Sequence, residues 1–263
     1  MKILAFDTSA KTASVAVCEG GEILGVSNIE NGLTQSELVL PMAEALLKQL
    51  KLSFSDIDIY AVTVGPGSFT GVRIGVATVK GLAFGRNIPT APVSTLEALA
   101  ENAAGLSGLI VPCMDARRGQ FYTATFASSA SGIERITPDR AISAEELADE
   151  LRSYDGDIYI TGDGYEAAHR LLCPLGVRLA VTPYLLRAQN AVSIAKVAEK
   201  CTRRDHVSAS ASWRPHIFVC LRQSARGLRE KTKTKEIYYE KDLHRRGQRR
   251  LLPQGRIQEL SYR

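Results

Sequence analysis

The sequence is poor in the residue patterns that build disulfide scaffolds, metal sites and membrane spans. Its five cysteines form no C-x-x-C pair and its four histidines have no metal-ligand spacing, so we expect reduced structural thiols and no metal site. No run of 18 apolar residues occurs, and the first residues lack the features of a signal peptide. This predicts a cytoplasmic protein without a membrane segment. A Gly-x-Ser-x-Gly nucleophile motif is also missing.

Positive charge is concentrated at one end of the sequence. The chain has 33 Lys and Arg against 28 Asp and Glu, a net charge of +5. Residues 213–263 hold 14 of the basic and 5 of the acidic residues, so this segment carries +9 and the rest of the chain −4. A basic surface for nucleic acid is therefore predicted only for the end of the chain.

Residues 65–75, Gly-Pro-Gly-Ser-Phe-Thr-Gly-Val-Arg-Ile-Gly, join a predicted strand to a predicted helix. A dinucleotide fingerprint fits poorly, because the third glycine comes one position late and no acid follows about 20 residues on. A P-loop is excluded, because no lysine precedes the helix before Lys80. Two interpretations remain: Ser68 or Thr70 caps a helix whose free N–H groups hold an anion, or the capped turn binds no ligand.

Strands and helices alternate along the chain, which predicts an α/β fold. Residues 1–104 are expected to form an N-terminal lobe, with strands at 3–6, 13–18, 22–28, 57–64 and 88–93, helices at 35–50 and 70–85, and a helix from the capping residue Ser94 to 104. Residues 105–212 are expected to form a C-terminal lobe, with strands at 109–114, 121–126, 157–160 and 177–181, helices at 143–151 and from 164 to 172, and a helix at 191–201 that packs back on the first lobe.

Two of these helices have unusual surfaces. The apolar face of helix 35–50 is too wide for one neighbour. Helix 70–85 has glycines spaced four residues apart, at 71 and 75 after Gly67 in the preceding turn, and again at 81 and 85. Each helical glycine costs about 0.8–1 kcal/mol relative to alanine, so we expect the close approach of another backbone. That backbone belongs either to the protein's own sheet or to another subunit.

The first predicted strand ends in Asp7-Thr8-Ser9. Actin-like and sugar-kinase-like ATPases place at this point the aspartate and turn that meet nucleotide phosphates and magnesium. Such enzymes have glycine soon after the aspartate, so that the backbone can approach phosphate, whereas Thr8, Ser9 and Ala10 follow here. We therefore expect a two-lobed actin-like (ribonuclease H-like) fold with a degenerate nucleotide site, for which the candidate residues are Asp7, Thr8, Ser9, Gly65, Gly67 and Ser68. For Asp115, Arg117 and Arg118 an anion site and a solvated turn both stay open.

These motifs resemble the bacterial TsaB family, formerly called YeaZ. The resemblance rests on Phe6-Asp-Thr-Ser9, Ser36-Glu37 before a Leu/Pro helix, the 65–75 motif, Asp115-Ala-Arg-Arg118 before Tyr122, and Gly162-Asp-Gly164, in this order from residue 1 to about 212. Many relatives have histidine where this chain has Gln35, and both side chains can donate a hydrogen bond. The resemblance implies a non-catalytic subunit that pairs with the related TsaD, is joined by a TsaE-like ATPase, and takes part in transferring threonylcarbamoyl to the adenosine beside the anticodon of ANN-decoding tRNAs.

The resemblance also implies where partners bind. The two helices would form half of a four-helix bundle with TsaD, or with a second copy when the chain is alone. No cofactor of its own is expected; ATP or ADP with Mg would be sought at the interface with TsaD, and tRNA would be bound through the complex. The alternative function is an independent ATPase or sugar kinase. The candidate partner-interface residues are Leu38, Met42, Ala45, Leu46, Gln49, Thr70, Gly71, Ile74, Gly75, Thr78 and Leu82.

The end of the chain departs from the family pattern. Relatives end with a Pro-x-Tyr-Leu-Arg strand and a short Gln-Ala-Glu-Arg-like segment, whereas Trp213 begins an unrelated run. Reading its codons two nucleotides on permits the missing ending, so one interpretation makes residues 213–263 a frameshift product, expected to be disordered. The other makes them a genuine basic arm for tRNA. The nucleotide sequence near codon 212 decides between them.

Overall fold

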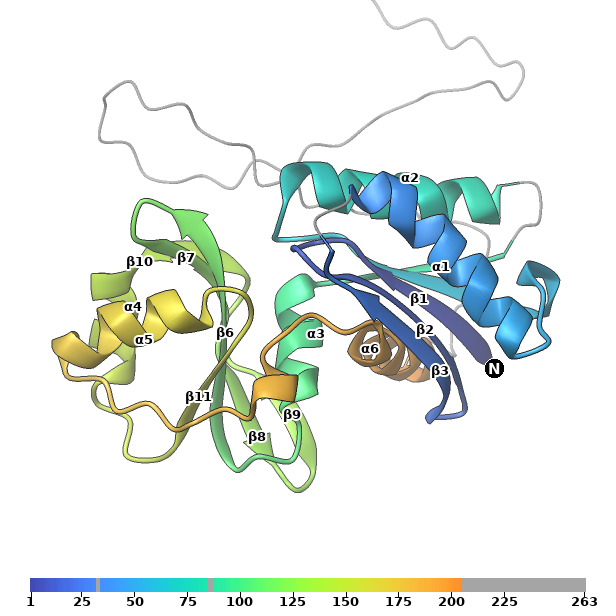
Figure 1. Ribbon diagram of the computed structural model, residues 1–263. Helices are drawn as coiled ribbons and strands as arrows, with labels where there is room; N and C mark the ends of the chain where they lie inside the picture. The colour runs from blue at the N-terminus through green and yellow to red at the C-terminus, as the bar shows by residue number, and fades with distance from the viewer. Residues whose placement is uncertain (32–33, 85–87, 205–263) are drawn as a thin grey trace, which may run out of the picture.

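A computed structural model describes residues 1–31, 34–84 and 88–204. The predictions for residues 213–263 lie outside this range. The described chain forms two lobes, each built around a β-sheet, with helices on the faces of the sheets (Figure 1).

The first lobe contains a five-stranded sheet in the order β3-β2-β1-β4-β5. Strands β1 to β3 form an antiparallel meander, with the glycine pair 20–21 in the turn between β2 and β3, and β4 and β5 run parallel to β1. β1 lies in the middle with apolar residues on both faces, as expected for a strand covered on both sides. The bounds are β1 Lys2–Asp7, β2 Ala13–Glu19, β3 Glu22–Ile29, β4 Ile59–Thr63 and β5 Thr90–Val93.

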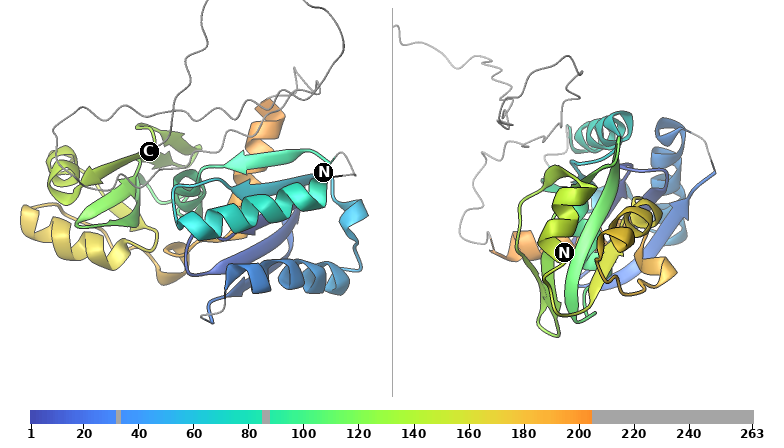
Figure 2. Two further views of the ribbon diagram at one scale, coloured as in Figure 1. Left: turned by 90° about the horizontal axis from the view of Figure 1, so that it is seen from above. Right: turned by 90° about the vertical axis from the view of Figure 1, so that its left-hand side faces the viewer.

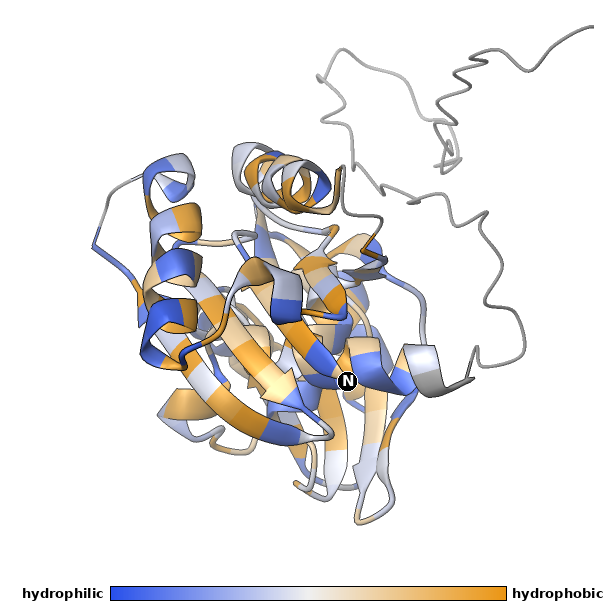
Figure 3. Ribbon diagram, turned by 90° about the vertical axis from the view of Figure 1, so that its right-hand side faces the viewer, coloured by the Kyte–Doolittle hydropathy of each residue, from blue (hydrophilic) through white to orange (hydrophobic). Residues whose placement is uncertain are grey.

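Helices cover both faces of this sheet. Helices α1 (Gln35–Gln49) and α2 (Phe69–Ala83) lie side by side on one face (Figure 2). The other face is covered by α6 (Ala191–Arg204), which packs on β1 and β2, with α3 (Thr95–Asn102) beside it. Hydrophobic residues gather on the strands between these helices (Figure 3). The final helix of the described chain therefore completes the core of the first lobe.

The second lobe is built on β6, its longest strand. β6 pairs in parallel with β11 on one side and antiparallel with β7 and β8 on the other. Helices α4 and α5 pack against this sheet in a separate core. The bounds are β6 Gly108–Arg117, β7 Gln120–Thr123, β8 Phe126–Ser129, β9 Gly132–Arg135, β10 Arg140–Ser143, β11 Ile158–Thr161, α4 Ala144–Leu151 and α5 Tyr165–Leu172; short 3-10 turns are η1 Phe54–Asp56, η2 Cys173–Leu175 and η3 Tyr184–Leu186.

Strands β7 and β8 correspond to the single strand predicted at 121–126. Their registers against β6 are continuous, pairing Thr123 with Cys113 and Phe126 with Ile110. The same register places residue 124 opposite Pro112, which has no N–H to donate, so the ladder is interrupted there. Thr125 instead bonds toward the next hairpin, where its carbonyl accepts the N–H of Ile136 at 2.8 Å. The predicted single strand is thus corrected to two, each with its own outer partner strand, β10 or β9.

Two further differences concern short strands. The predicted strand 177–181 is wrong, because these residues form only one bridge, between Tyr159 and Ala180. β9 and β10 were not predicted, because four-residue strands leave too few positions for an alternating pattern.

Candidate functional site

The turn after β1 is held by a buried carboxylate. Asp7 is 1% exposed, and its Oδ1 accepts hydrogen bonds from the Ser9 N–H at 2.8 Å, the Ser9 hydroxyl at 2.6 Å and the Thr63 hydroxyl at 3.1 Å. Burial raises the pKa of Asp7, and these donors partly oppose the rise. The aspartate thus fixes the shape of the β1 turn, residues 7–11, from inside the protein.

This turn packs directly on the start of α2. A Cβ added to Gly71 would lie 1.9 Å from the carbonyl oxygen of Thr8, and one added to Gly67 would lie 2.6 Å from that of Ser9. A Cβ on Gly75 would lie 2.4 Å from the Thr8 hydroxyl oxygen. The interpretation of these glycines as space for a partner is therefore corrected, because the chain's own turn fills that space.

Hydrogen bonds join the same two segments. The Thr8 hydroxyl donates to the carbonyl of Gly71 at 2.7 Å, and the Ser68 N–H donates to the carbonyl of Ser9 at 2.7 Å. Of the two predicted caps, Ser68 and Thr70, it is Ser68 that caps α2, its hydroxyl accepting the Gly71 N–H at 3.2 Å. Gln35 ties α1 to the turn by donating to the carbonyls of residues 10 and 11 at 3.0 and 3.1 Å.

The candidate cofactor residues are thus brought together, but they contact one another. Hydrogen bonds of Thr8, Ser9 and Ser68 join the β1 turn to the start of α2. Gly67 allows the same close approach because it has no side chain. The Gly65 carbonyl accepts the N–H of Thr95 at 2.9 Å. A nucleotide phosphate that approached the N-terminus of α2 would therefore meet the β1 turn, which is packed against it.

The two lobes meet at a second carboxylate, Asp163, which sequence reasoning did not assign to the site. The Asp163 side chain is exposed overall, but the atoms packed around its carboxylate partly desolvate it and raise its pKa. The nearby negative charge of Asp115 adds to the rise, whereas the Asp115 N–H and Lys11 of the first lobe lower the pKa. Asp163 in turn adds to the raised pKa of Asp7. Within the described residues, no group of His, Cys, Asp and Glu is arranged to hold a metal ion.

The eleven candidate interface residues fall into three groups. Met42 and Leu46 are 5% and 6% exposed and belong to the core under α1 and α2, and Gly71 and Gly75 are buried. These four residues lie inside the lobe, which corrects the expectation that they form a surface. Leu38, Ile74, Thr78 and Leu82 are partly buried, and Ala45, Gln49 and Thr70 are exposed.

One glycine of α2, Gly81, is not explained by close packing within the described chain. Gly81 is exposed, and a Cβ added there would have nothing within 4 Å. A glycine inside an exposed stretch of helix costs about 1 kcal/mol relative to alanine. Gly81 is therefore the glycine of α2 whose cost the described chain does not explain.

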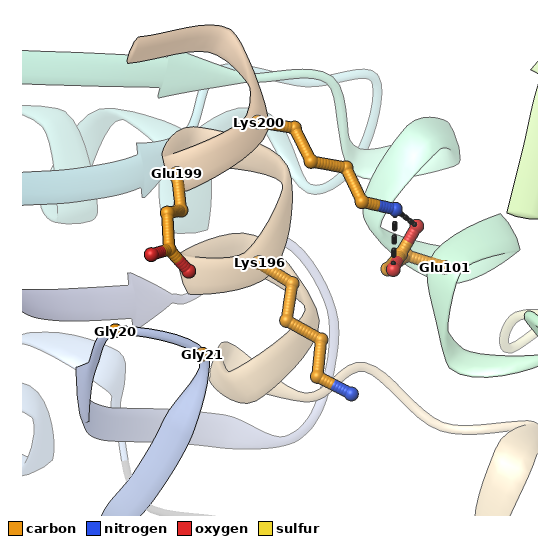
Figure 4. A pocket seen from close by; sticks show the side chains of 6 residues that line it. All are labelled: Gly20, Gly21, Glu101, Lys196, Glu199 and Lys200. Carbon is orange, nitrogen blue, oxygen red and sulfur yellow. Dashed lines mark hydrogen bonds and ion pairs between the residues drawn. The ribbon is translucent and has the colours of Figure 1, made fainter. Parts of the chain in front are cut away.

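A surface pocket lies on the other side of the first sheet, between the β2–β3 turn and α6. It is lined by Gly20, Gly21, Glu101, Lys196, Glu199 and Lys200 (Figure 4). The Lys200 amino group lies 2.7 Å from both carboxylate oxygens of Glu101, which is itself 7% exposed. This ion pair holds α6 against α3, so two of the charged residues that line the pocket have a structural role.

The buried cysteine thiols are not suited to act as nucleophiles. Two of the four described cysteines, Cys18 and Cys113, are buried. Burial raises the pKa of Cys18 to about 11 and that of Cys113 to about 12. A thiol with such a pKa is protonated at neutral pH and is a poor nucleophile.

Fold and site together define a class: a two-lobed α/β protein with an actin-like fold, in which the turn after β1, the candidate nucleotide site, is packed against the chain's own helix α2. The family described as TsaD, tRNA N6-adenosine threonylcarbamoyltransferase, matches residues 33–236. Proteins named tRNA threonylcarbamoyladenosine biosynthesis protein TsaB are similar to this chain. The one from Bacillus subtilis is 35% identical over 162 residues, 62% of this chain and 71% of that protein. The one from Escherichia coli is 34% identical over 173 residues, 64% and 73%.

Solved structures agree with these relatives. YeaZ from Pseudomonas aeruginosa superposes with a TM-score of 0.63 at 25% identity, over 77% of this chain and 92% of that one. A second structure, described as similar to the peptidase YeaZ, gives 0.65 at 25% identity over 78% and 93%. The chain therefore belongs to the TsaB (YeaZ) proteins of this family, and it has a role in the biosynthesis of threonylcarbamoyladenosine in tRNA. Every helix in the described ranges is too short or too polar to cross a membrane.

Proposed function

We propose that this chain is the non-catalytic subunit of a cytoplasmic tRNA threonylcarbamoyltransferase complex, in which it pairs with a TsaD-like subunit and activates it. One observation carries the proposal: the β1 turn is packed on α2, with the Thr8 carbonyl against Gly71. A nucleotide phosphate would have to displace this contact. The chain itself therefore has no catalysis, and a TsaE-like ATPase, nucleotide with Mg, and tRNA are bound by the assembled complex.

The partner surface in this proposal is the outer face of α1 and α2. We define the outer face as the exposed or partly buried residues Leu38, Ala45, Gln49, Thr70, Ile74, Thr78, Gly81 and Leu82. It is made mostly of small and apolar side chains, although α1 and α2 already have their other faces in the core. Gly81 would allow a partner helix to approach closely, which supports this surface. A homodimer through the same face is the expected state of the chain without its partner.

The interface test uses residues that do not hold the fold together. We expect Ala45→Glu and Gly81→Glu each to weaken co-purification with the TsaD-like subunit by tenfold or more, because each places an unpaired charge on the outer face. Thermal unfolding of both variants should stay close to that of the wild type. Ser153→Glu, an exposed position on the second lobe, is the matched control. Full binding by both variants would show that the interface lies elsewhere.

The alternative, an independent ATPase or sugar kinase, is tested on the isolated protein. Titration with Mg-ATP in a calorimeter, followed by a hydrolysis assay, should give neither binding nor turnover. Micromolar affinity with turnover would contradict the non-catalytic assignment.

A further inference from the structure

We propose that the β6–β7 hairpin of the second lobe, Arg117-Arg118-Gly119, binds the phosphate backbone of tRNA through its two guanidinium groups. The inference rests on the proposed function and deepens it, because it gives the RNA a contact on this subunit. Four observations carry it: the backbone at the two arginines, the exposure and lack of partners of their side chains, the use of the Asp115 carboxylate, and the position of the hairpin.

The backbone here is unfavourable for arginine. Arg117, Arg118 and Gly119 have φ of 71°, 55° and 72°, so three consecutive residues lie in the left-handed region. Arg118 and Gly119 form a two-residue turn between paired residues Arg117 and Gln120. Such turns favour Asn-Gly, and a left-handed φ at the paired residue Arg117 is also unfavourable for any residue other than glycine. Arginine at both positions is therefore not explained by the folding of the hairpin.

Among the described residues, the side chains of Arg117 and Arg118 are exposed and have no bonding partner. Within the described residues, neither guanidinium forms a hydrogen bond or an ion pair. Four other arginines of the second lobe do pair with carboxylates: Arg135, Arg140, Arg152 and Arg187. The two hairpin charges are thus available to a ligand.

The carboxylate of Asp115, two residues before Arg117, is already in use. Asp115 Oδ1 accepts the backbone N–H of Arg117 at 2.7 Å, and the Asp115 N–H bonds to Asp163. Asp115 therefore shapes the turn and leaves the guanidinium groups free. Lys11 of the first lobe lies close enough to Asp163 to lower its pKa.

The ligand class follows from charge geometry and position. The planar fork of a guanidinium matches two oxygens of a phosphate, and neighbouring guanidiniums can bind successive phosphates of a strand. The hairpin ends β6 at the upper edge of the second lobe in Figure 1, the same side of the molecule as α2. RNA bound there would lie beside the outer face and hence beside the proposed partner subunit.

The test compares a double variant with a matched control in the full-length protein. R117G/R118N places the residues that the turn favours, and R170N/R178N removes two other exposed arginines of the same lobe. The probe is an unmodified ANN-decoding tRNA transcript, titrated at several KCl concentrations. All proteins keep residues 213–263, so that differences report the hairpin alone.

We expect R117G/R118N to bind the transcript about tenfold more weakly, with a slope of log K against log salt smaller by about 1 to 2, because one or two phosphate contacts are lost. Its unfolding midpoint should be unchanged or higher, and the control should bind like the wild type. Equal affinity and slope for the double variant, or the same loss in the control, would overturn the proposal. Loss of TsaD-like partner binding with intact RNA binding would also overturn it and make the hairpin a protein contact. Because co-purification is measured separately, failure of the proposed function is distinguishable from failure of this inference.

Discussion

At the scale of single residues, the contact between Gly71 and Thr8 decides what the glycines of α2 do. A Cβ at position 71 would lie 1.9 Å from the Thr8 carbonyl oxygen, which leaves no room for any other residue. Gly81, ten residues along the same helix, faces open space. We therefore expect the same substitution, glycine to alanine, to have opposite effects on the free energy of unfolding at positions 71 and 81.

We expect Gly71→Ala to lower the free energy of unfolding by about 3 kcal/mol, because the turn must move away from the helix. Gly81→Ala should raise it by about 1 kcal/mol, because alanine is the better helix former. Urea unfolding of both variants and the wild type checks the pair. Equal midpoints for Gly71→Ala and the wild type would contradict the close packing of the β1 turn.

The sequence could predict the cap of α2 but not the role of its glycines. Ser68 follows a local rule, since a cap is recognised from the residues next to it. The neighbour of Gly71 is Thr8, 63 positions earlier, and no local pattern identifies it. For the same reason Asp163 was not predicted as a neighbour of Asp7, although the glycines on both sides of it marked a close approach.

At the scale of elements, a hydroxyl of the first sheet holds the first residue of α6. Ser14 of β2 accepts the N–H of Ala191, the first residue of α6, at 2.8 Å and donates to Asn28 of β3 at 2.5 Å. The first N–H groups of a helix have no partner inside the helix. A strand of the first lobe thus caps the final helix.

Ser14→Ala should lower the free energy of unfolding by about 2 kcal/mol, because the buried N–H of Ala191 loses its acceptor. Chemical denaturation gives this value directly. Ser131→Ala, in an exposed hairpin, serves as the control and should change little. A similarly small effect for both variants would mean that water replaces the Ser14 hydroxyl.

Elements with strong periodicity were predicted well. The helices at 35–50, 70–85 and 191–201 and the meander at the start agree with the structure to within a few residues. The split of strand 121–126 was missed because its cause, Pro112, lies on the partner strand. The strand predicted at 177–181 has the right composition, but only one of its residues pairs.

At the scale of the whole molecule, each lobe contributes one aspartate whose charged form is disfavoured: Asp7 from the first lobe and Asp163 from the second. Desolvation raises the pKa of both Asp7 and Asp163 above the ordinary aspartate value of 3.8. A raised folded-state pKa means that the folded protein binds the proton more tightly than the unfolded chain. The corresponding stability is fully present below pH 3.8 and is lost as the pH rises through the raised value.

Asp7→Asn should therefore be more stable than the wild type at pH 8, with a smaller advantage at pH 5. Asparagine keeps an oxygen for the donors from Ser9 and Thr63 but has no charge to bury. Thermal unfolding at several pH values between 4 and 8 measures the difference. Parallel curves for the two proteins would show that Asp7 does not titrate differently in the folded state.

The position of α6 also has a consequence for the order of events during synthesis. The first sheet is complete once residue 93 has been made, but the helix that covers its second face begins at residue 191. A ribosome adds roughly 5–20 residues per second, so this apolar face waits for several seconds before its cover emerges. During that interval the growing chain exposes Ile3, Ala5 and Ile59, which makes the first lobe of the nascent protein a natural substrate for chaperones.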